Sequence, residues 1–188
     1  DITRVLTELG YVEDKQVTQL FGDRRMVFHD PAFGRHIDVF YNYLDFCHPI
    51  SFIGRLEAEE ITIPLAELLL EKLQIVQINE KDVIACIMLM REHKLGEGDK
   101  ETINTKIIVN TLANDWGWWR TATGNLELID GRLAQYKDLD DEDRRIVHDK
   151  IMQLRKIVDD APKSLKWKTR SLVGEKIKWY KDVEELTR

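Results

Sequence analysis

The chain has 188 residues, with 28 Lys and Arg against 34 Asp and Glu, so its formal net charge is −6. Hydrophobic residues make up 43% and charged residues 33%, a balance typical of a soluble globular protein whose core needs no disulfide or metal. No apolar run approaches the roughly 20 residues of a membrane-spanning helix, and Cys47 and Cys86 lack metal-ligand spacing. We therefore exclude a membrane-embedded protein and expect a cytoplasmic protein with two buried, reduced thiols.

The first 60 residues predict a helix followed by a small sheet. Apolar residues at positions 2, 5, 6 and 9 indicate the end of an amphipathic helix that Gly10 terminates. Residues 24–29 and 35–41 have the composition of strands and are separated by a turn with proline and glycine, which predicts a hairpin. Residues 51–56 predict a further short strand.

Asp38 lies in the middle of the second hairpin strand. Side chains alternate between the two faces of a strand, so Asp38 points away from Ile37 and Val39. Acidic residues are depleted in strands of this composition. A solvent-facing position on a half-exposed sheet explains Asp38, and so does a metal-binding carboxylate on the open face of the sheet. The pattern alone favours neither interpretation.

Residues 61–93 predict two consecutive helices. Pro64 suits the first helical position, because its missing N–H would have no partner there. Asn79 is a typical cap for the second helix. Apolar residues at three- and four-residue steps predict the buried faces: Leu65, Leu68, Leu69, Leu73 and Val76 in the first helix, and Val83, Ile84, Ile87, Met88 and Met90 in the second.

Lys72 interrupts the apolar face of the first of these helices. Its spacing from Leu68, Leu69 and Val76 predicts a core-facing Cα, and a buried ammonium is costly unless it reaches water or an anion. One interpretation is that Lys72 extends to solvent or pairs with a nearby carboxylate. The other is that Lys72 reaches a cleft and holds a phosphate, with Asp82 close by at the start of the next helix.

The second half of the chain predicts helices throughout. Residues 102–112 and 142–158 carry apolar residues at helical spacing, and Pro162 ends the second of these segments. The tryptophan-rich residues 116–119 predict core packing rather than a ligand platform. Two shorter basic helices are expected at the end of the chain, separated near Gly174.

The charge is unevenly spread, because residues 161–182 carry +5 and the rest of the chain −11. A basic segment of this kind binds a polyanion or balances the acidic surface of its own protein, and a solvated helix face is the simpler explanation. If the segment binds RNA, the candidate residues are Lys163, Lys166, Trp167, Lys168, Arg170, Lys178 and Trp179.

Three stretches of the sequence resemble a known family. They are RHIDVF at residues 35–40, PLAELLLEKLQ at 64–74 and NEKD at 79–82. These stretches are similar to the abortive-infection toxin branch of the DNA polymerase beta-like nucleotidyltransferase superfamily. The likeness covers most of the first 93 residues, and residues 161–180 resemble a helical tail in uncharacterised relatives.

The resemblance implies a nucleotidyltransferase that binds ATP or another nucleoside triphosphate with Mg²⁺ and transfers a nucleotidyl group to an RNA or protein acceptor. Such chemistry uses two metal ions about 4 Å apart, bridged by carboxylates. The resemblance implies that Asp38 is a catalytic metal ligand and that Lys72 holds the triphosphate. It also implies that Asp82 is an orienting acid, with Arg24 and Arg25 as secondary phosphate contacts.

Nucleotidyltransferases of this kind also carry a glycine-serine turn followed by an Asp-x-Asp pair, and no such pair occurs before Asp38. The sequence starts at Asp1 without methionine, so we expect this element to lie upstream or to be missing. Relatives often carry a second acid at the position of Ala85. One aspartate cannot organise two-metal chemistry, so we expect this polypeptide alone not to transfer nucleotides.

Two alternatives to an enzyme remain open at this point. One is a catalytically inactive module on the same fold that binds a nucleotide, RNA or protein. The other is a nucleic-acid-binding protein whose sheet is only structural, and the basic segment is its sole support. The upstream sequence distinguishes an enzyme from the inactive module, and the salt dependence of RNA binding tests the nucleic-acid-binding protein.

We therefore expect an α+β fold in three parts. Residues 1–62 would form a small mixed or antiparallel nucleotidyltransferase-like sheet, residues 63–95 a central helix pair, and residues 96–188 a helical C-terminal region with a basic tail. The expected partners are a nucleoside triphosphate and RNA, with no membrane. An exposed strand edge would suit a homodimer or an antitoxin partner.

Overall fold

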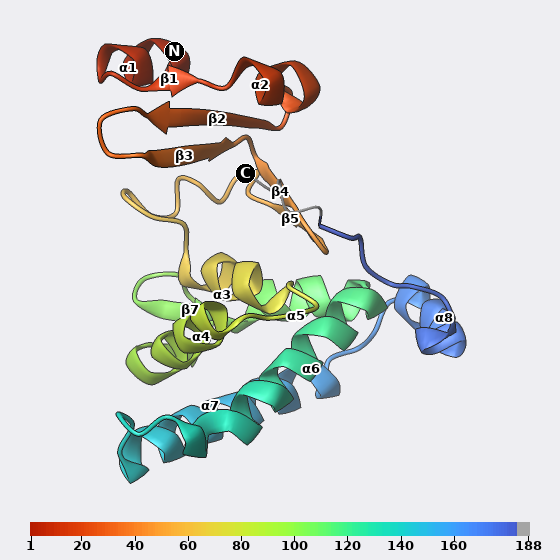
Figure 1. Cartoon of the computed structure of the whole chain (residues 1–188). Helices are drawn as coiled ribbons and strands as arrows, with labels where there is room; N and C mark the ends of the chain where they lie inside the picture. The colour runs from red at the N-terminus through yellow and green to blue at the C-terminus, as the bar shows by residue number, and fades with distance from the viewer. Residues whose placement is uncertain (184–188) are drawn as a thin grey trace. The chain divides into compact units, whose positions relative to one another are not determined.

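The computed structural model describes residues 1–183 and shows an α+β protein (Figure 1). Its internal contacts divide the chain into two compact units. The first contains residues 1–44 and 51–53, and the second contains residues 45–50 and the chain from residue 54 onward. The α+β class and the helical C-terminal region expected from the sequence are confirmed. Within residues 1–183, no helix has the length and apolar character needed to cross a membrane.

The first unit is built on a three-stranded antiparallel sheet in the order β1-β2-β3. Its elements are α1 (Ile2–Glu8), β1 (Val12–Glu13), α2 (Lys15–Phe21), β2 (Arg25–Asp30) and β3 (Arg35–Phe40). The predicted hairpin is therefore confirmed as β2 and β3. A two-stranded sheet of β4 (Tyr43–Asp45) and β5 (Pro49–Ser51) follows, where the chain passes into the second unit.

The hairpin turn is held by its own side chains and sets the register of the sheet. Asp30 Oδ1 accepts hydrogen bonds from the backbone N–H groups of Ala32 and Phe33, at 3.0 and 3.2 Å. Gly34 follows with a φ of +62°, a conformation that glycine adopts without a steric cost. The resulting register places Asp38 opposite Val27 on the central strand β2.

The second unit is mainly helical. Its helices are α3 (Leu65–Leu73), α4 (Glu80–Glu92), α5 (Thr105–Asn114), α6 (Trp116–Arg132), α7 (Asp141–Asp160) and α8 (Leu165–Val173). Two short parallel strands, β6 (Lys94–Gly96) and β7 (Thr102–Asn104), lie between α4 and α5, and 3₁₀ turns follow α6 and α8, at Leu133–Gln135 and Gly174–Lys176. The long helix α7 packs against α4, α5 and α6, and α3 packs against the same three helices (Figure 1). Apolar side chains from these helices form the core: Leu69, Leu73, Met90, Ile108, Leu112, Leu126, Ile129, Ile151 and Leu154.

Most helices of the second unit begin at a capping side chain that accepts a backbone N–H of the first turn. These caps are Asn79, Asn104, Asp115, Asp140 and Ser164. The cap predicted at Asn79 is therefore confirmed. At α3, Pro64 is the capping residue, in extended conformation, rather than the first helical residue.

The buried faces of α3 and α4 differ from those that the periodicity predicted. Helix α3 ends at Leu73, before Val76, and its buried apolar residues are Ala66, Leu69, Leu70 and Leu73. In α4, Ile84 and Met88 are each 44% exposed, and Cys86 and Leu89 are buried instead. Neighbours cover α3 on several sides, because β7, α5 and α6 pack on it together with α4. The buried face is therefore rotated relative to the one that spacing alone predicts.

Two further segments were predicted wrongly. Of residues 51–56, only Ser51 lies in a strand, because the chain turns at Gly54, whose φ is +69°. Residues 102–104 form strand β7 instead of the first turn of a helix. Helix α5 starts only at Thr105, because the Asn104 side chain accepts the N–H of Lys106 at 3.1 Å.

The second of the two predicted basic helices does not form within the described residues. Gly174, with a φ of +58°, ends α8, and after the 3₁₀ turn residues 177–183 have no regular secondary structure. The Arg170 guanidinium donates to the backbone carbonyls of Gly174 and Ile177, at 2.7 and 2.5 Å. These carbonyls therefore have a side-chain partner in place of a helical N–H. Residues 184–188, the end of the predicted helix, lie outside the described residues.

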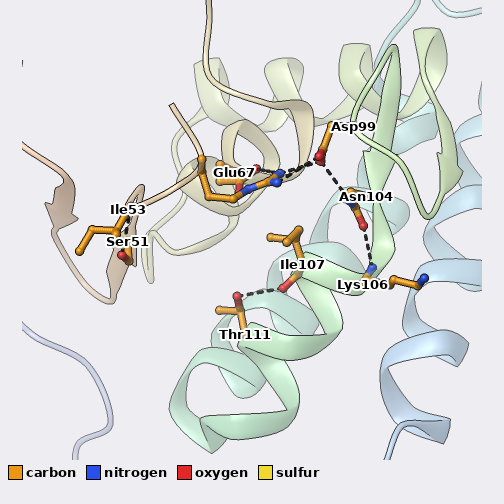
Figure 2. Close-up of polar contacts among 9 residues, drawn as sticks. Ser51, Ile53, Glu67, Asp99, Asn104, Lys106, Ile107 and Thr111 are labelled. Carbon is orange, nitrogen blue, oxygen red and sulfur yellow. Dashed lines mark hydrogen bonds and ion pairs between the residues drawn. The ribbon is translucent and has the colours of Figure 1, made fainter. Parts of the chain in front are cut away.

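Arg55 ties the segment before α3 to the helical unit. Its guanidinium pairs with Glu67 on α3 and with Asp99 in the loop before β7, where its Nη1 and Nη2 lie 3.0 and 2.6 Å from the Asp99 carboxylate oxygens. The side chain of Glu67 is only 2% exposed. Figure 2 shows how the chain of bonds continues from Asp99 to Asn104 and the backbone of Lys106 at the start of α5. The second unit thus includes Arg55.

We expect the Arg55→Met variant to lose about 3 kcal/mol or more of unfolding free energy, because it leaves the buried Glu67 carboxylate without its cation. The Arg55→Met/Glu67→Met double variant should lose less than the single variant, since no unpaired buried charge remains on α3. Urea denaturation at pH 7 measures both values. A single variant within about 1 kcal/mol of the parent protein would contradict this role.

Candidate functional site

Lys72 and Asp82 lie together where α3 and α4 meet. The Lys72 ammonium is 3.7 Å from Asp82 Oδ1 and 3.2 Å from Glu71 Oε1. The side chains are partly buried, with 23% of Lys72 and 15% of Asp82 exposed. The sequence analysis expected Asp82 close to Lys72, and the structure has this proximity. The pairing with a nearby carboxylate that one of the two interpretations of Lys72 expected is also present.

Two clefts flank this pair. Lys72 lines a shallow cleft of about 290 Å³ with Leu68 and Ala85, and Asp82 lines a second cleft of about 540 Å³ with Asn79. Cys86 lies one turn further along α4 and is buried. Burial and the nearby Asp82 charge raise the pKa of the Cys86 thiol to about 12, so the thiol stays protonated. The charged groups of this site are therefore carboxylates and one ammonium, without a reactive thiolate.

Asp38 belongs to the first unit and is paired with Arg25 of the neighbouring strand. Nη2 and Nε of Arg25 lie 2.6 and 3.1 Å from Asp38 Oδ1, and His36 Nε2 lies 3.3 Å from Oδ2. The Arg25 guanidinium also lies over the ring of Phe40, 5.4 Å from its centroid. Arg24 is exposed, with its Nε 3.3 Å from Asp23. Asp38 is thus half-buried and bound to a cation, and its role as a metal ligand stays a prediction.

The described residues do not bring together the ligands of a two-metal centre. No group of three or more His, Cys, Asp and Glu side chains in residues 1–183 could hold a metal ion. Two-metal chemistry needs several carboxylates that bridge ions about 4 Å apart. No nucleotidyl transfer step can be derived from the residues that the structure places together.

Three of the seven candidate RNA-binding residues do not line the cleft that the other four share. Lys163 Nζ lies within hydrogen-bonding distance of the carbonyls of Val158, Asp159 and Ala161, so it caps the C-terminus of α7. Trp167 is half-buried and packs edge-on against Trp119, at a centroid distance of 5.3 Å. Lys168 is exposed on α8.

The other four, Lys166, Arg170, Lys178 and Trp179, line one cleft of about 780 Å³ in the second unit. Its walls are α8, the start of α6, residues 47–49 and residues 178–181. Trp116, Tyr180 and Lys181 line the same cleft. A basic and aromatic cleft therefore replaces the basic helix face that the sequence predicted; we call it the α8 cleft.

A buried histidine forms part of the α8 cleft. His48 is 3% exposed, its ring stacks on Trp118 at a centroid distance of 5.0 Å, and its Nε2 lies 2.8 Å from Thr121 Oγ1. The Trp179 indole N–H donates to the same hydroxyl at 3.0 Å, so Thr121 links residue 48 to the C-terminal segment. Burial lowers the pKa of His48 to about 4, and the imidazole is neutral at pH 7.

Sequence reasoning missed His48, Thr121, Tyr180 and Lys181 as members of one site. They come from three segments that are far apart in the sequence, at residues 48, 121 and 180–181, and no spacing pattern links these segments. The tryptophan-rich segment at residues 116–119 was the one visible sign, because Trp116 and Trp118 are buried here as predicted. Cys47 and Cys86 are both buried free thiols, as expected.

Comparisons of this chain with protein-family models, with curated proteins and with solved structures gave no match.

The neutral His48 makes the stability of the second unit depend on pH. Its pKa is lowered from 6.5 to about 4 on folding, so the unfolded chain binds more protons between these values and stability falls as the pH falls through this window. We expect His48 to contribute a loss of about 2 kcal/mol between pH 7 and pH 5.

Urea denaturation of the parent protein and of His48→Phe at pH 7, 6 and 5 measures this contribution. The variant keeps a ring against Trp118 and should show the smaller loss with falling pH. Equal pH dependence in the two proteins would show that folding does not lower the pKa of His48.

Proposed function

We propose that this chain is a nucleotidyltransferase-like protein whose helical unit binds the triphosphate of a nucleotide, with Lys72 as the phosphate-binding group. The observation that carries the proposal is the proximity of Lys72 and Asp82, 3.7 Å apart on successive helices. The resemblance implied this arrangement, with Lys72 directed at the triphosphate and Asp82 as the acid of the next helix.

The surroundings of Lys72 support a role beyond an ion pair. An ammonium has three N–H donors, and only Glu71, at 3.2 Å, is within hydrogen-bonding distance of Nζ among the described residues. The Asp82 oxygen at 3.7 Å attracts the charge without taking a donor in a hydrogen bond. Lys72 also lines a cleft, so donors are available to a phosphate that enters it.

The two acids beside Lys72 predict a dependence on magnesium. Glu71 and Asp82 outnumber the single ammonium, and they would repel a bare triphosphate. Mg²⁺ in nucleotide sites is held by one or two protein carboxylates and by the substrate phosphates, and it lowers the negative charge that the site must accept. The carboxylate of Asp82 fits this requirement for one ion.

Transfer of the nucleotidyl group to an RNA or protein acceptor is a separate proposal and rests on the resemblance alone. The described residues provide no two-metal centre, so the proposal for the second unit is limited to nucleotide binding. A catalytically inactive nucleotide-binding module would have the same Lys72 site. The experiment below measures binding and applies to both cases.

We expect ATP with Mg²⁺ to raise the midpoint of thermal unfolding, because a ligand that binds only the folded state stabilises it by mass action. At a ligand concentration of about 100 times Kd the gain is about 2.7 kcal/mol. For a chain of this length it corresponds to a rise of roughly 5–10 °C. Lys72→Met keeps most of the apolar stem and removes the charge, so this variant should lose most of the rise. ATP without Mg²⁺ should give a smaller rise than ATP with Mg²⁺.

Lys156→Met is the matched control, because Lys156 is an exposed lysine of α7 that pairs with Asp160. It should show the full rise. If the parent protein shows no rise, or if Lys72→Met shows the same rise as the control, Lys72 is a structural lysine and the proposed site is wrong. Unfolding of each variant without ligand separates a loss of binding from a loss of stability.

A further inference from the structure

We infer that the α8 cleft binds single-stranded nucleic acid. The cleft combines fixed positive charge with half-buried aromatic rings, which are the two features that bind phosphates and bases of an unpaired strand. It is distinct from the site at Lys72, which does not line it. The inference therefore does not rest on nucleotide triphosphate binding.

Arg170 is one of the cations that line this cleft. Its guanidinium lies over the Trp116 ring, 4.9 Å from the centroid, and donates to the carbonyls of Gly174 and Ile177. Both partners are neutral, and no carboxylate pairs with Arg170 among the ion pairs of residues 1–183. A held guanidinium with an uncompensated charge is suited to a phosphate group.

Three lysines line the cleft together with Arg170, and each is paired with an acidic side chain that a phosphate could replace. Lys178 pairs with Asp182, Lys166 with Asp115 and Lys181 with Asp45. The lysine side chains are 47–78% exposed, and exposed ion pairs of this kind contribute little to stability. A phosphate backbone can therefore take the place of the carboxylates at small cost. The basic charge of the cleft contrasts with the net −11 of the sequence outside residues 161–182.

The aromatic side of the cleft suits unpaired bases. Trp179 stands edge-on to Trp116 and to Tyr180, at centroid distances of 5.9 and 5.4 Å, and Lys178 lies over the Tyr180 ring. Tyr180 is half-buried and lines the α8 cleft and the neighbouring cleft that contains Asp82. In a duplex the faces of the bases are stacked on one another, so only a single strand can place a base against such a ring.

Fluorescence anisotropy with a labelled oligouridylate of about 12 nucleotides tests the inference, without ATP or magnesium. Binding to the parent protein should weaken steeply between about 50 and 200 mM salt. Lys178→Gln should reduce the slope of log K against log salt by about 0.7, the value for one phosphate contact of a single strand. Tyr180→Leu should weaken binding by roughly tenfold and leave the slope unchanged, because it removes a stacking surface and no charge.

Lys156→Gln is the control for Lys178→Gln, because the Lys156–Asp160 pair has the same four-residue spacing on an exposed helix face away from the cleft. It should bind like the parent protein. Absence of binding at low salt, or equal losses in the two lysine variants, would overturn the inference. A polyglutamate or a duplex that competes as well as the oligouridylate, together with no effect of Tyr180→Leu, would show a general polyanion surface and would also overturn it.

Discussion

The second unit depends on the buried carboxylate of Glu67. A charge that is 2% exposed must be paired, and its cation comes from Arg55, twelve residues earlier in the chain. Asp99 accepts from the same guanidinium, which holds the pKa of that carboxyl below its usual value. One guanidinium therefore joins the segment before α3, α3 itself and the loop before β7. The position of α3, and with it the position of Lys72, follows from this constraint.

The long helices could be predicted from the sequence, because burial of an apolar face is the main force that stabilises them and its period is visible in the residues. The errors occur where a tertiary contact overrides the local pattern. Asn104 caps α5 and leaves residues 102–104 to a strand, and Arg170 occupies the carbonyls of Gly174 and Ile177 that a further helix would have used. The local sequence around Asn104 and Arg170 does not indicate which backbone groups their side chains bind. Ile84 and Met88 belong to the predicted apolar face of α4 but are exposed, because the neighbouring elements cover only part of that face.

The two parts of the candidate site were predictable to different degrees. Lys72 lies at the end of α3 and Asp82 in the first turn of α4, so the short loop between the packed helices brings them near each other. His48, Thr121 and Trp179 meet only through the folded arrangement of three distant segments. The charge of the C-terminal segment was visible in the composition. That Lys163 caps α7 while Lys178 lines a cleft depends on where the chain turns back, and composition does not contain that information.

The return of the C-terminal segment has a consequence for synthesis of the protein. The backbone N–H of Lys181 donates to the carbonyl of Cys47, and its ammonium bonds to Asp45, so one of the last described residues closes onto the segment that precedes α3. A ribosome releases residue 181 well after residues 45–50 have left the exit tunnel. Until then Thr121 lacks the indole N–H of Trp179, and the wall of the cleft is open. The helical unit therefore completes its packing only after residues 179–181 have left the exit tunnel, and before that a chaperone would find the surface around His48 and Trp118 uncovered.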